Sequence, residues 1–285
     1  MPNIVQSERD RNARFYEAKW GDHQGYWGEH YPRWALPYSR MYAVRNAEVR
    51  DRVPRGLRRL LDVGCGVGDN LADLADLADE LLGVDPAPAN VERAHANMSR
   101  SGCASRIELA RAEDLPFEDG WVDCVLMLDV IEHVTDRPRA LREVERVLAP
   151  GGTLICVTPV ARTLHLLERL DRVLGAPVHA AVKTVRRWRG TYVDSDEAGR
   201  PFEEFLSEPE LRVLVTGAGL AVREQSRVCF YPGPEGGGAF LHVARALTAG
   251  PGGTRIRAAV VRLLEAIERR ERFNQKQIVV AAKPH

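Results

Sequence analysis

The stretch Leu61-Asp62-Val63-Gly64-Cys65-Gly66-Val67-Gly68 decides the fold. Its apolar start is typical of a buried strand. Its three glycines at alternate positions predict a sharp turn in which a ligand can lie against bare peptide, because no Cβ intervenes. A dinucleotide-binding turn spaces its glycines differently and rarely has an acid directly before the first one. The carboxylate of Asp62 would repel a pyrophosphate but suits a cationic amino-acid ligand.

Strand-like and helix-like segments alternate from about residue 58 to 158, which predicts an α/β fold with helices on both faces of a parallel sheet. We expect a doubly wound, seven-stranded, mostly parallel sheet. Its expected strands are residues 59–63, 80–85, 106–110, 122–128, 153–158, 220–231 and 277–282. The expected helices are residues 70–77, 87–100, 137–148, 161–174, 207–217 and 256–273. Pro150-Gly151-Gly152 is predicted to be a turn before the fifth strand.

Composition excludes several function classes. The chain has 285 residues with 40 basic and 40 acidic side chains, so no global attraction to nucleic acid or anionic membrane is indicated. No apolar run approaches the ~20 residues that span a bilayer, and the N-terminus has no apolar signal core. The five cysteines are scattered without a C-x-x-C pair. We therefore expect a reduced, cytoplasmic protein with neither a nucleic-acid partner nor an integral-membrane segment.

Acidic side chains follow the expected strands in order. Asp85 ends the second strand, 23 residues after Asp62, where an acid can accept hydrogen bonds from both ribose hydroxyls of a nucleoside. After the third strand, Asp114 could accept from an adenine amine while Leu115 packs on the ring. Asp129 ends the fourth strand. Each feature alone has an ordinary explanation as a turn, a helix start or solvated loop charge. Together they favour a ligand site at the carboxyl ends of the strands.

The pattern resembles the class I S-adenosylmethionine-dependent methyltransferases, in the small-molecule branch of ubiquinone, menaquinone and natural-product biosynthesis. Asp129-Val130-Ile131-Glu132-His133-Val134 and residues 142–152 and 205–211 extend the match, which covers roughly residues 55–230 and the last strand. The resemblance implies a Rossmann-like methyltransferase fold and S-adenosylmethionine as cofactor. It implies that the methionine moiety is held at the glycine turn, the ribose by Asp85 and the adenine by Asp114 with Leu115. The implied cofactor contacts are Asp62, Gly64, Cys65, Gly66, Asp85, Pro86, Glu113, Asp114, Leu115, Leu128 and Asp129.

Methyl transfer from a sulfonium is an in-line displacement that depends mainly on alignment. A hydroxyl acceptor also needs a general base, most often histidine. His133 is the first candidate, with His165 and His179 as weaker ones, although His133 could instead brace a loop. Some relatives use an acid-x-x-Glu-His segment as a metal site. Here the first acid is Asp129, and Gly199-Arg200-Pro201-Phe202 replaces the expected later histidine, so we predict no bound metal.

The remaining segments suggest an acceptor pocket. Residues 1–57 are expected to form a helical leader, and residues 58–285 the methyltransferase domain with lid-like insertions at about 161–206 and 232–273. In relatives such a leader closes over the cofactor, so its aromatic side chains are candidate substrate contacts, although they could simply pack on the core. These are Tyr26, Trp27, Tyr31 and Trp34. The basic run 183–189 could bind an anionic substrate or a membrane, or be a solvated surface. The helix 256–273 could cover the site or form a homodimer contact.

The sequence therefore predicts methyl transfer to a small molecule, at a hydroxyl oxygen of a phenol, quinol, polyketide or sugar. Methylation of carbon or nitrogen is the first alternative. A cofactor-binding, cyclase-like relative that no longer methylates is the second. RNA methylation is disfavoured, because the net charge is zero and no RNA-binding module is visible.

Overall fold

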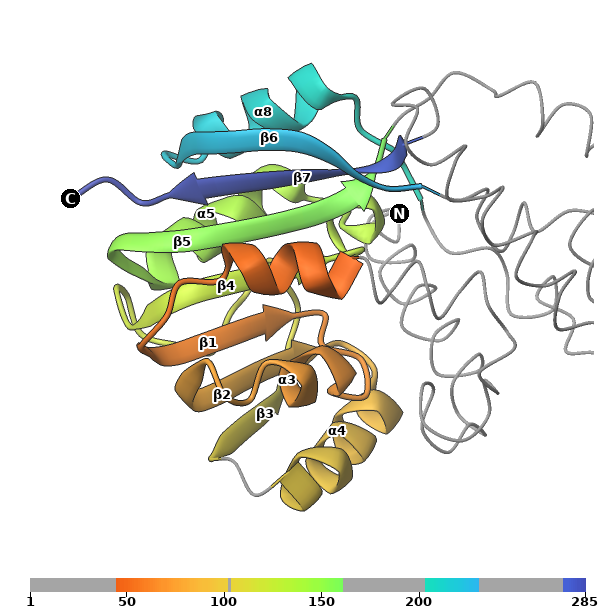
Figure 1. Cartoon of the computed structure of the whole chain (residues 1–285), viewed down its shortest axis with the longest axis vertical. Helices are drawn as coiled ribbons and strands as arrows, with labels where there is room; N and C mark the ends of the chain where they lie inside the picture. Colours follow the sequence, from red (N-terminus) through yellow and green to blue (C-terminus); the bar gives the residue numbers. More distant parts are fainter. Residues whose placement is uncertain (1–44, 102–103, 161–202, 231–273) are drawn as a thin grey trace, which may run out of the picture.

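The computed structural model describes residues 45–101, 104–160, 203–230 and 274–285 (Figure 1). These residues form a seven-stranded sheet in the order β3-β2-β1-β4-β5-β7-β6, which confirms the predicted doubly wound fold. The strands are β1 (Leu57–Val63), β2 (Ala78–Asp85), β3 (Ser105–Leu109), β4 (Val122–Leu128), β5 (Leu148–Pro159), β6 (Ala221–Phe230) and β7 (Asn274–Ala282). The helices are residues 45–52, α3 (Asp69–Asp73), α4 (Pro88–Ser101), the 3₁₀ helix Ile131–His133, α5 (Arg137–Val147) and α8 (Glu208–Gly217).

Strand direction determines which residues meet at the edge of the sheet. Strands β1 to β5 pair in parallel, whereas β7 is antiparallel to both β5 and β6. The first residues of β7 therefore lie at the edge where β1, β4 and β5 end, which Figure 1 shows from the opposed arrowheads. Pro159, the last residue of β5, is in register with Lys276 of β7. This edge is the one where doubly wound sheets bind ligands.

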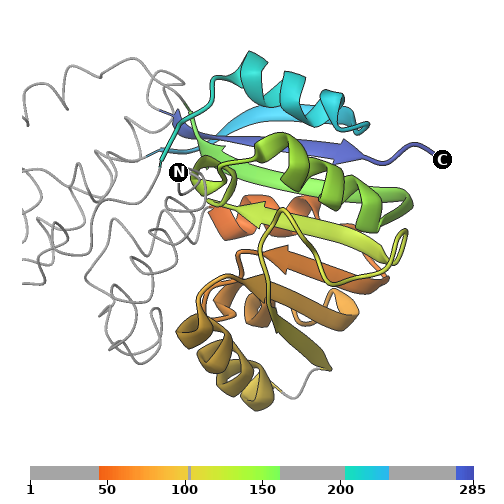
Figure 2. The ribbon, with the colours of Figure 1, turned by 180° about the vertical axis from the view of Figure 1, so that it is seen from behind.

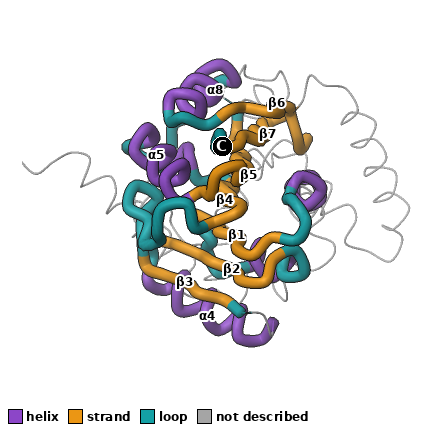
Figure 3. Tube along the Cα trace, turned by 90° about the vertical axis from the view of Figure 1, so that its left-hand side faces the viewer, coloured by secondary structure: helices purple, strands orange, loops and turns teal. Residues whose placement is uncertain are grey.

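Helices cover both faces of the sheet, and alternate strand residues point to each. On one face Leu61 and Val125 pack with α5 and α8 (Figure 2). On the other, Leu60 and Leu126 pack with α3, α4 and the helix 45–52, which contributes Val49 to the same core (Figures 1 and 3). This side-chain alternation is what a strand buried on both faces requires. The helix 45–52, within the expected leader, thus packs on the sheet itself.

Two local predictions were wrong. The helix expected at 70–77 is α-helical only to Asp73. From there to Leu77 the backbone N–H groups bond three residues back, as in 3₁₀ turns, and bring the chain quickly to β2. The turn expected at Pro150-Gly151-Gly152 lies inside β5 instead. The register against β4 shifts between Val122 and Cys124, and this irregularity accommodates the extra residues of β5.

The helix expected at 207–217 is confirmed, and its capping box forms. Ser207 Oγ accepts from the Glu210 N–H at 3.5 Å, and the Glu210 carboxylate accepts from the Ser207 N–H at 2.8 Å. The helices expected at 161–174 and 256–273 lie outside the described residues. No helix in the described ranges is long and apolar enough to cross a membrane.

Candidate functional site

The glycine turn after β1 is held against β2 by its backbone. The N–H groups of Gly64 and Cys65 both donate to the Val84 carbonyl, at 2.8 and 3.0 Å. Gly64 has φ +73°, and a Cβ there would lie 2.5 Å from Cγ2 of Val130. Gly66 has φ +55°, and a Cβ there would meet no atom of the described residues within 4 Å. The turn thus needs glycine for backbone conformation and close packing, and its Gly66 side is open.

Asp85 joins this turn to the start of α4. Its carboxylate accepts from the N–H of Gly66 at 3.0 Å, from the N–H of Ala87 at 2.9 Å and from the side chain of Asn90 at 3.0 Å. Burial raises the pKa of Asp85, and these three hydrogen bonds oppose that rise. A carboxylate has about four acceptor sites, so a ribose diol would share them with the turn. The neighbouring Pro86 is half-buried.

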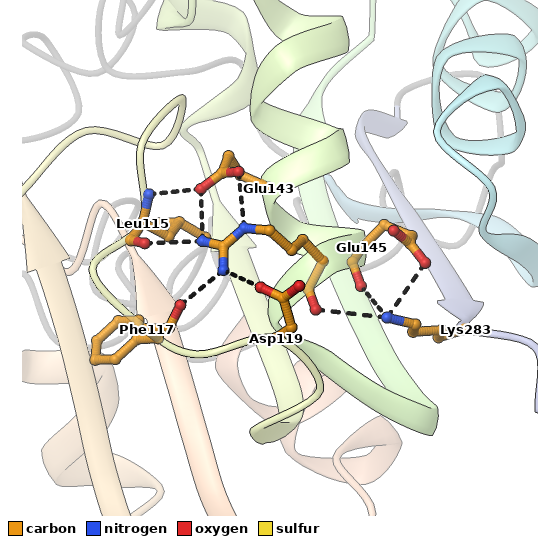
Figure 4. A network of polar contacts seen from close by, with 7 residues as sticks. Leu115, Phe117, Asp119, Glu143, Glu145 and Lys283 are labelled. Carbon is orange, nitrogen blue, oxygen red and sulfur yellow. Dashed lines mark hydrogen bonds and ion pairs between the residues drawn. The ribbon is translucent and has the colours of Figure 1, made fainter.

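The loop after β3 is fastened to α5 by two side chains (Figure 4). Glu143 accepts from the Leu115 N–H at 2.9 Å, and Arg146 donates to the Leu115 carbonyl at 2.9 Å and the Phe117 carbonyl at 2.8 Å. Arg146 also pairs with Glu143 at 2.7 Å and Asp119 at 2.7 Å. The hydrogen-bonded Arg146 guanidinium lowers the pKa of Glu143. Both backbone polar groups of Leu115 are therefore fixed by α5.

This loop contains the residues predicted to hold adenine. Leu115 and Glu113 are buried, whereas Asp114 is exposed, and its N–H donates to the Arg111 carbonyl at 3.1 Å. Asp114 thus lies exposed on a loop whose backbone is held in place, and its contact with adenine stays a prediction. Sequence reasoning did not assign a role to Arg146, although it lies in the stretch 142–152 that supported the resemblance.

Asp129, after β4, lies between two cations. Arg45 donates to its Oδ2 at 2.8 Å, and the ammonium of Lys276 pairs with the same oxygen. Asp129 has φ +61°, in the left-handed region that glycine adopts freely and that asparagine and aspartate adopt more often than other residues. Burial would raise the pKa of Asp129, but Lys276 and Arg45 outweigh it and hold the pKa below its ordinary value. Sequence reasoning missed both cations, because they lie 84 and 147 residues away from Asp129.

Besides Oδ2 of Asp69 at the start of α3, two buried carboxylate oxygens have no hydrogen-bond partner among the described residues. They are Oδ1 of Asp62 and Oδ1 of Asp129, at the ends of the adjacent strands β1 and β4. Burial raises the pKa of Asp62 to about 7, and its other oxygen accepts from Asn70 at 3.4 Å. Unmatched buried acceptors are costly, so a cationic donor is expected to bind there. Arg45, which also donates to Asn70 at 2.7 Å, is suited to a carboxylate.

Comparison with known proteins agrees with this chemistry. A family model described as a methyltransferase domain matches residues 61–156. The ubiquinone biosynthesis O-methyltransferase of Methylobacterium nodulans is 30% identical over 241 residues, 79% of this chain and 87% of that protein. The chain belongs to the S-adenosylmethionine-dependent methyltransferase family. The ajmaline N-methyltransferase of Rauvolfia serpentina is 33% identical over 47% of this chain and 50% of that protein.

Several of these alignments cover only part of the relative's sequence. The chain spans from half to just under two thirds of the length of the first curated relatives. Among solved structures, that of the [4+2]-cyclase SpnF has a TM-score of 0.58 at 21% identity, covering 99% of this chain and 95% of that chain. At this identity the likeness shows a shared fold.

The residues present fit S-adenosylmethionine, the cofactor of this methyltransferase family. The unmatched oxygens of Asp62 and Asp129 suit its α-ammonium group, and Arg45 suits its carboxylate. The open side of Gly66 leaves room beside Asp85 for the ribose. These assignments rest on the matching of donors and acceptors and remain predictions.

Other predicted residues are placed as follows. Cys65 is 4% exposed and its Sγ packs towards Gly83, so only its backbone can face a ligand. Leu128 borders a cavity of about 180 Å³ between the helix 45–52 and α3, next to Asn70. This volume is below the ~300 Å³ of small ligand pockets, so it could hold only part of a cofactor. Tyr26, Trp27, Tyr31, Trp34, His165 and His179 lie outside the described residues.

His133 and Glu132 occupy the 3₁₀ helix after β4. The Nε2 of His133 lies 4.0 Å from a carboxylate oxygen of Glu203. Glu132 is 2% exposed and accepts from the Thr158 hydroxyl at 2.9 Å, which directs its carboxylate into the core. Burial, together with the charge of Asp129, raises the pKa of Glu132 to about 8. Whether His133 acts as a base stays a prediction.

Proposed function

We propose that this protein transfers the methyl group of S-adenosylmethionine to a hydroxyl oxygen of a small molecule, in the class of phenols, quinols, polyketides or sugars. Family membership supports methyl transfer. The match over 87% of a ubiquinone biosynthesis O-methyltransferase supports oxygen as the acceptor atom.

One observation supports cofactor binding in this chain most directly. Among the described residues, one buried oxygen each of Asp62 and Asp129 has no partner beside a guanidinium, and this set is complementary to an amino-acid zwitterion. A pyrophosphate ligand would instead face two carboxylates, which would repel it. The donor and acceptor set thus favours a methionine moiety over a dinucleotide.

The chain's own residues would then act mainly by alignment. The cofactor, when bound, supplies an electrophilic methyl group. The glycine turn, Asp85 and the Arg146-held loop would fix the cofactor at the tips of β1, β2 and β3, which leaves the β4–β5–β7 side for the acceptor. On that side His133 is our candidate for removing the acceptor proton. Its Glu203 neighbour, 4.0 Å away, could orient the ring.

Methylation of nitrogen is the second candidate, favoured by the 33% identity to an N-methyltransferase. The two candidates share the cofactor site and differ only in the acceptor atom. The methyl carbon of the product separates them, because its ¹³C chemical shift distinguishes O-, N- and C-methyl groups.

The test has two arms. Calorimetry with S-adenosylhomocysteine measures cofactor binding, and we expect saturable 1:1 binding. S-adenosylmethionine labelled with ¹³C in its methyl group is then incubated with a panel of phenolic, quinol, polyketide and sugar acceptors. Binding without transfer to any acceptor would favour the non-methylating alternative. Absence of binding would refute the cofactor assignment itself.

A further inference from the structure

The last strand brings a lysine to the edge where the acceptor is expected. Because β7 runs antiparallel, Lys276 lies beside Pro159 at the end of β5. Its side chain extends across to Asp129, which follows β4, and the ammonium pairs with Oδ2 of that carboxylate. The Lys276 side chain is only 9% exposed, so its charge is held inside the site and not in solvent.

The same carboxylate opens the acid-x-x-Glu-His segment that some relatives use to bind a metal. Mg²⁺ and Ca²⁺ are held by several oxygen ligands that converge on one point. Here the three side chains do not converge. One carboxylate oxygen of Asp129 pairs with both Arg45 and Lys276. The Glu132 carboxylate accepts a hydrogen bond from the Thr158 hydroxyl in the core. His133 lies at 4.0 Å from Glu203.

The positive charges around Asp129 also disfavour a metal ion there. A divalent cation placed at Asp129 would lie close to the Lys276 ammonium and the Arg45 guanidinium, and like charges at such short range repel strongly in a partly buried site. In the described residues, no group of three or more His, Cys, Asp or Glu side chains is arranged to hold a metal ion.

We propose that Lys276 replaces the divalent cation of metal-dependent relatives, so that its ammonium provides the positive charge at Asp129 and this site binds no Mg²⁺ or Mn²⁺. Lys276 is a positioning residue: its ammonium pairs with Oδ2 of Asp129 and holds that carboxylate in place without a metal ion.

The test is direct metal binding by the full chain. The protein is treated with EDTA, desalted and titrated with Mn²⁺ in a calorimeter, without cofactor or acceptor. We expect no saturable binding by the wild type in the millimolar range. Lys276→Met removes the charge while keeping a long apolar stem, and we expect Mn²⁺ affinity to rise by roughly tenfold or more. Adding Asp129→Asn to that variant should abolish the gain.

Matched controls separate charge from packing. Lys276→Arg retains the cation and should bind Mn²⁺ no better than the wild type. Lys283→Met removes a lysine just beyond the same strand, where Lys283 donates to the Glu145 carbonyl at 2.8 Å, and should also match the wild type. Lys276→Gln serves if Lys276→Met does not fold, as judged by circular dichroism and thermal melting.

Two results would overturn the proposal. Saturable 1:1 Mn²⁺ binding by the wild type that is lost in Asp129→Asn would show that a metal does occupy the site. Unchanged Mn²⁺ affinity in folded Lys276→Met or Lys276→Gln would show that lysine does not exclude it. The inference goes beyond the proposed function, and neither readout uses methyl transfer. Its failure is therefore distinguishable from the failure of S-adenosylhomocysteine to bind.

Discussion

Replacing Arg146 by methionine tests whether α5 positions the adenine loop. The guanidinium donates to the carbonyls of Leu115 and Phe117 at 2.9 and 2.8 Å and pairs with Glu143 and Asp119 (Figure 4). A neutral hydrogen bond contributes about 1 kcal/mol and one to a charged group about 1.5–3 kcal/mol. The Arg146 side chain is 29% exposed, so water replaces part of this loss. We expect the free energy of unfolding to fall by about 2–3 kcal/mol.

Arg146→Met should also weaken cofactor binding, because the adenine loop then loses its hydrogen bonds from Arg146 of α5. Without Arg146, the Leu115 carbonyl is no longer held and Asp114 is no longer presented from a fixed backbone. Ordering two loop residues on binding costs about 1 kcal/mol each, at the low end of the range for fixing a backbone. We expect the affinity for S-adenosylhomocysteine to fall by roughly tenfold to a hundredfold, since about 1.4 kcal/mol is one factor of ten. Homocysteine alone, which has no adenine, should bind equally to both proteins.

Unfolding in guanidinium chloride measures the change in stability, and calorimetry measures the affinity for S-adenosylhomocysteine. Arg146→Lys keeps the charge but loses the planar fork, so it should fall between the wild type and Arg146→Met. Lys283→Met is the matched control, because Lys283 contacts the same end of α5 through the Glu145 carbonyl and does not touch the loop. If Arg146→Met lost stability but bound S-adenosylhomocysteine as the wild type does, the positioning role would be refuted.

Three further predictions concern the other side of the cofactor site. Gly64→Ala should reduce S-adenosylhomocysteine affinity at least a hundredfold in calorimetry. Its Cβ would clash with Val130 at 2.5 Å, and the backbone strain at φ +73° would remain, so adding Val130→Ala should restore affinity only in part. Asp85→Ala leaves three donors without their acceptor and should weaken binding by roughly a hundredfold, whereas unchanged affinity would show that Asp85 does not serve the cofactor. The Asp62 carboxyl, with Asn70, Arg45 and Asp85 around it, has a pKa raised to about 7, and only its ionised form pairs with an ammonium group. Affinity should therefore fall as the pH drops below about 7, by at most about tenfold per pH unit, and an equally steep dependence in Asp62→Asn would contradict this role.

The sequence predicts the parts of the site that depend on local pattern. The glycine turn, Asp85 and the loop at Glu113-Asp114-Leu115 are each encoded within a few residues, by backbone freedom and by the strand end that precedes them. The structure brings them to one edge as expected. The same local reasoning failed at Pro150-Gly151-Gly152. Glycine and proline there predict a turn, but β5 continues through them. The Gly151 N–H donates to the Lys283 carbonyl at 2.9 Å, and a register shift against β4 accommodates the extra residues.

The cations of the site could not be predicted in this way. Arg45 belongs to a helix before the sheet and Lys276 to its last strand, and neither position has a sequence pattern that marks it as functional. Their proximity to Asp129 depends on two features of topology. The helix 45–52 packs on the face of β1 and β4, and β7 is inserted antiparallel between β5 and β6. Once the sheet order was known, a search for basic residues near the start of the antiparallel strand β7 would have found Lys276.

The charges of the site also indicate how the cofactor would be accommodated. Without ligand, Arg45 is held by Asp129, and one oxygen each of Asp62 and Asp129 has no partner among the described residues. A bound zwitterion would offer Arg45 a carboxylate and the two acids an ammonium group. Every charge lost from one contact would then be regained in another, because the amino-acid group itself brings no net charge into the buried edge. A neutral nucleoside lacking the amino-acid group offers no such exchange. We therefore infer that the Arg45–Asp129 pair selects for the methionine end of the cofactor, and Arg45→Met should reduce S-adenosylhomocysteine affinity while leaving that for adenosine unchanged.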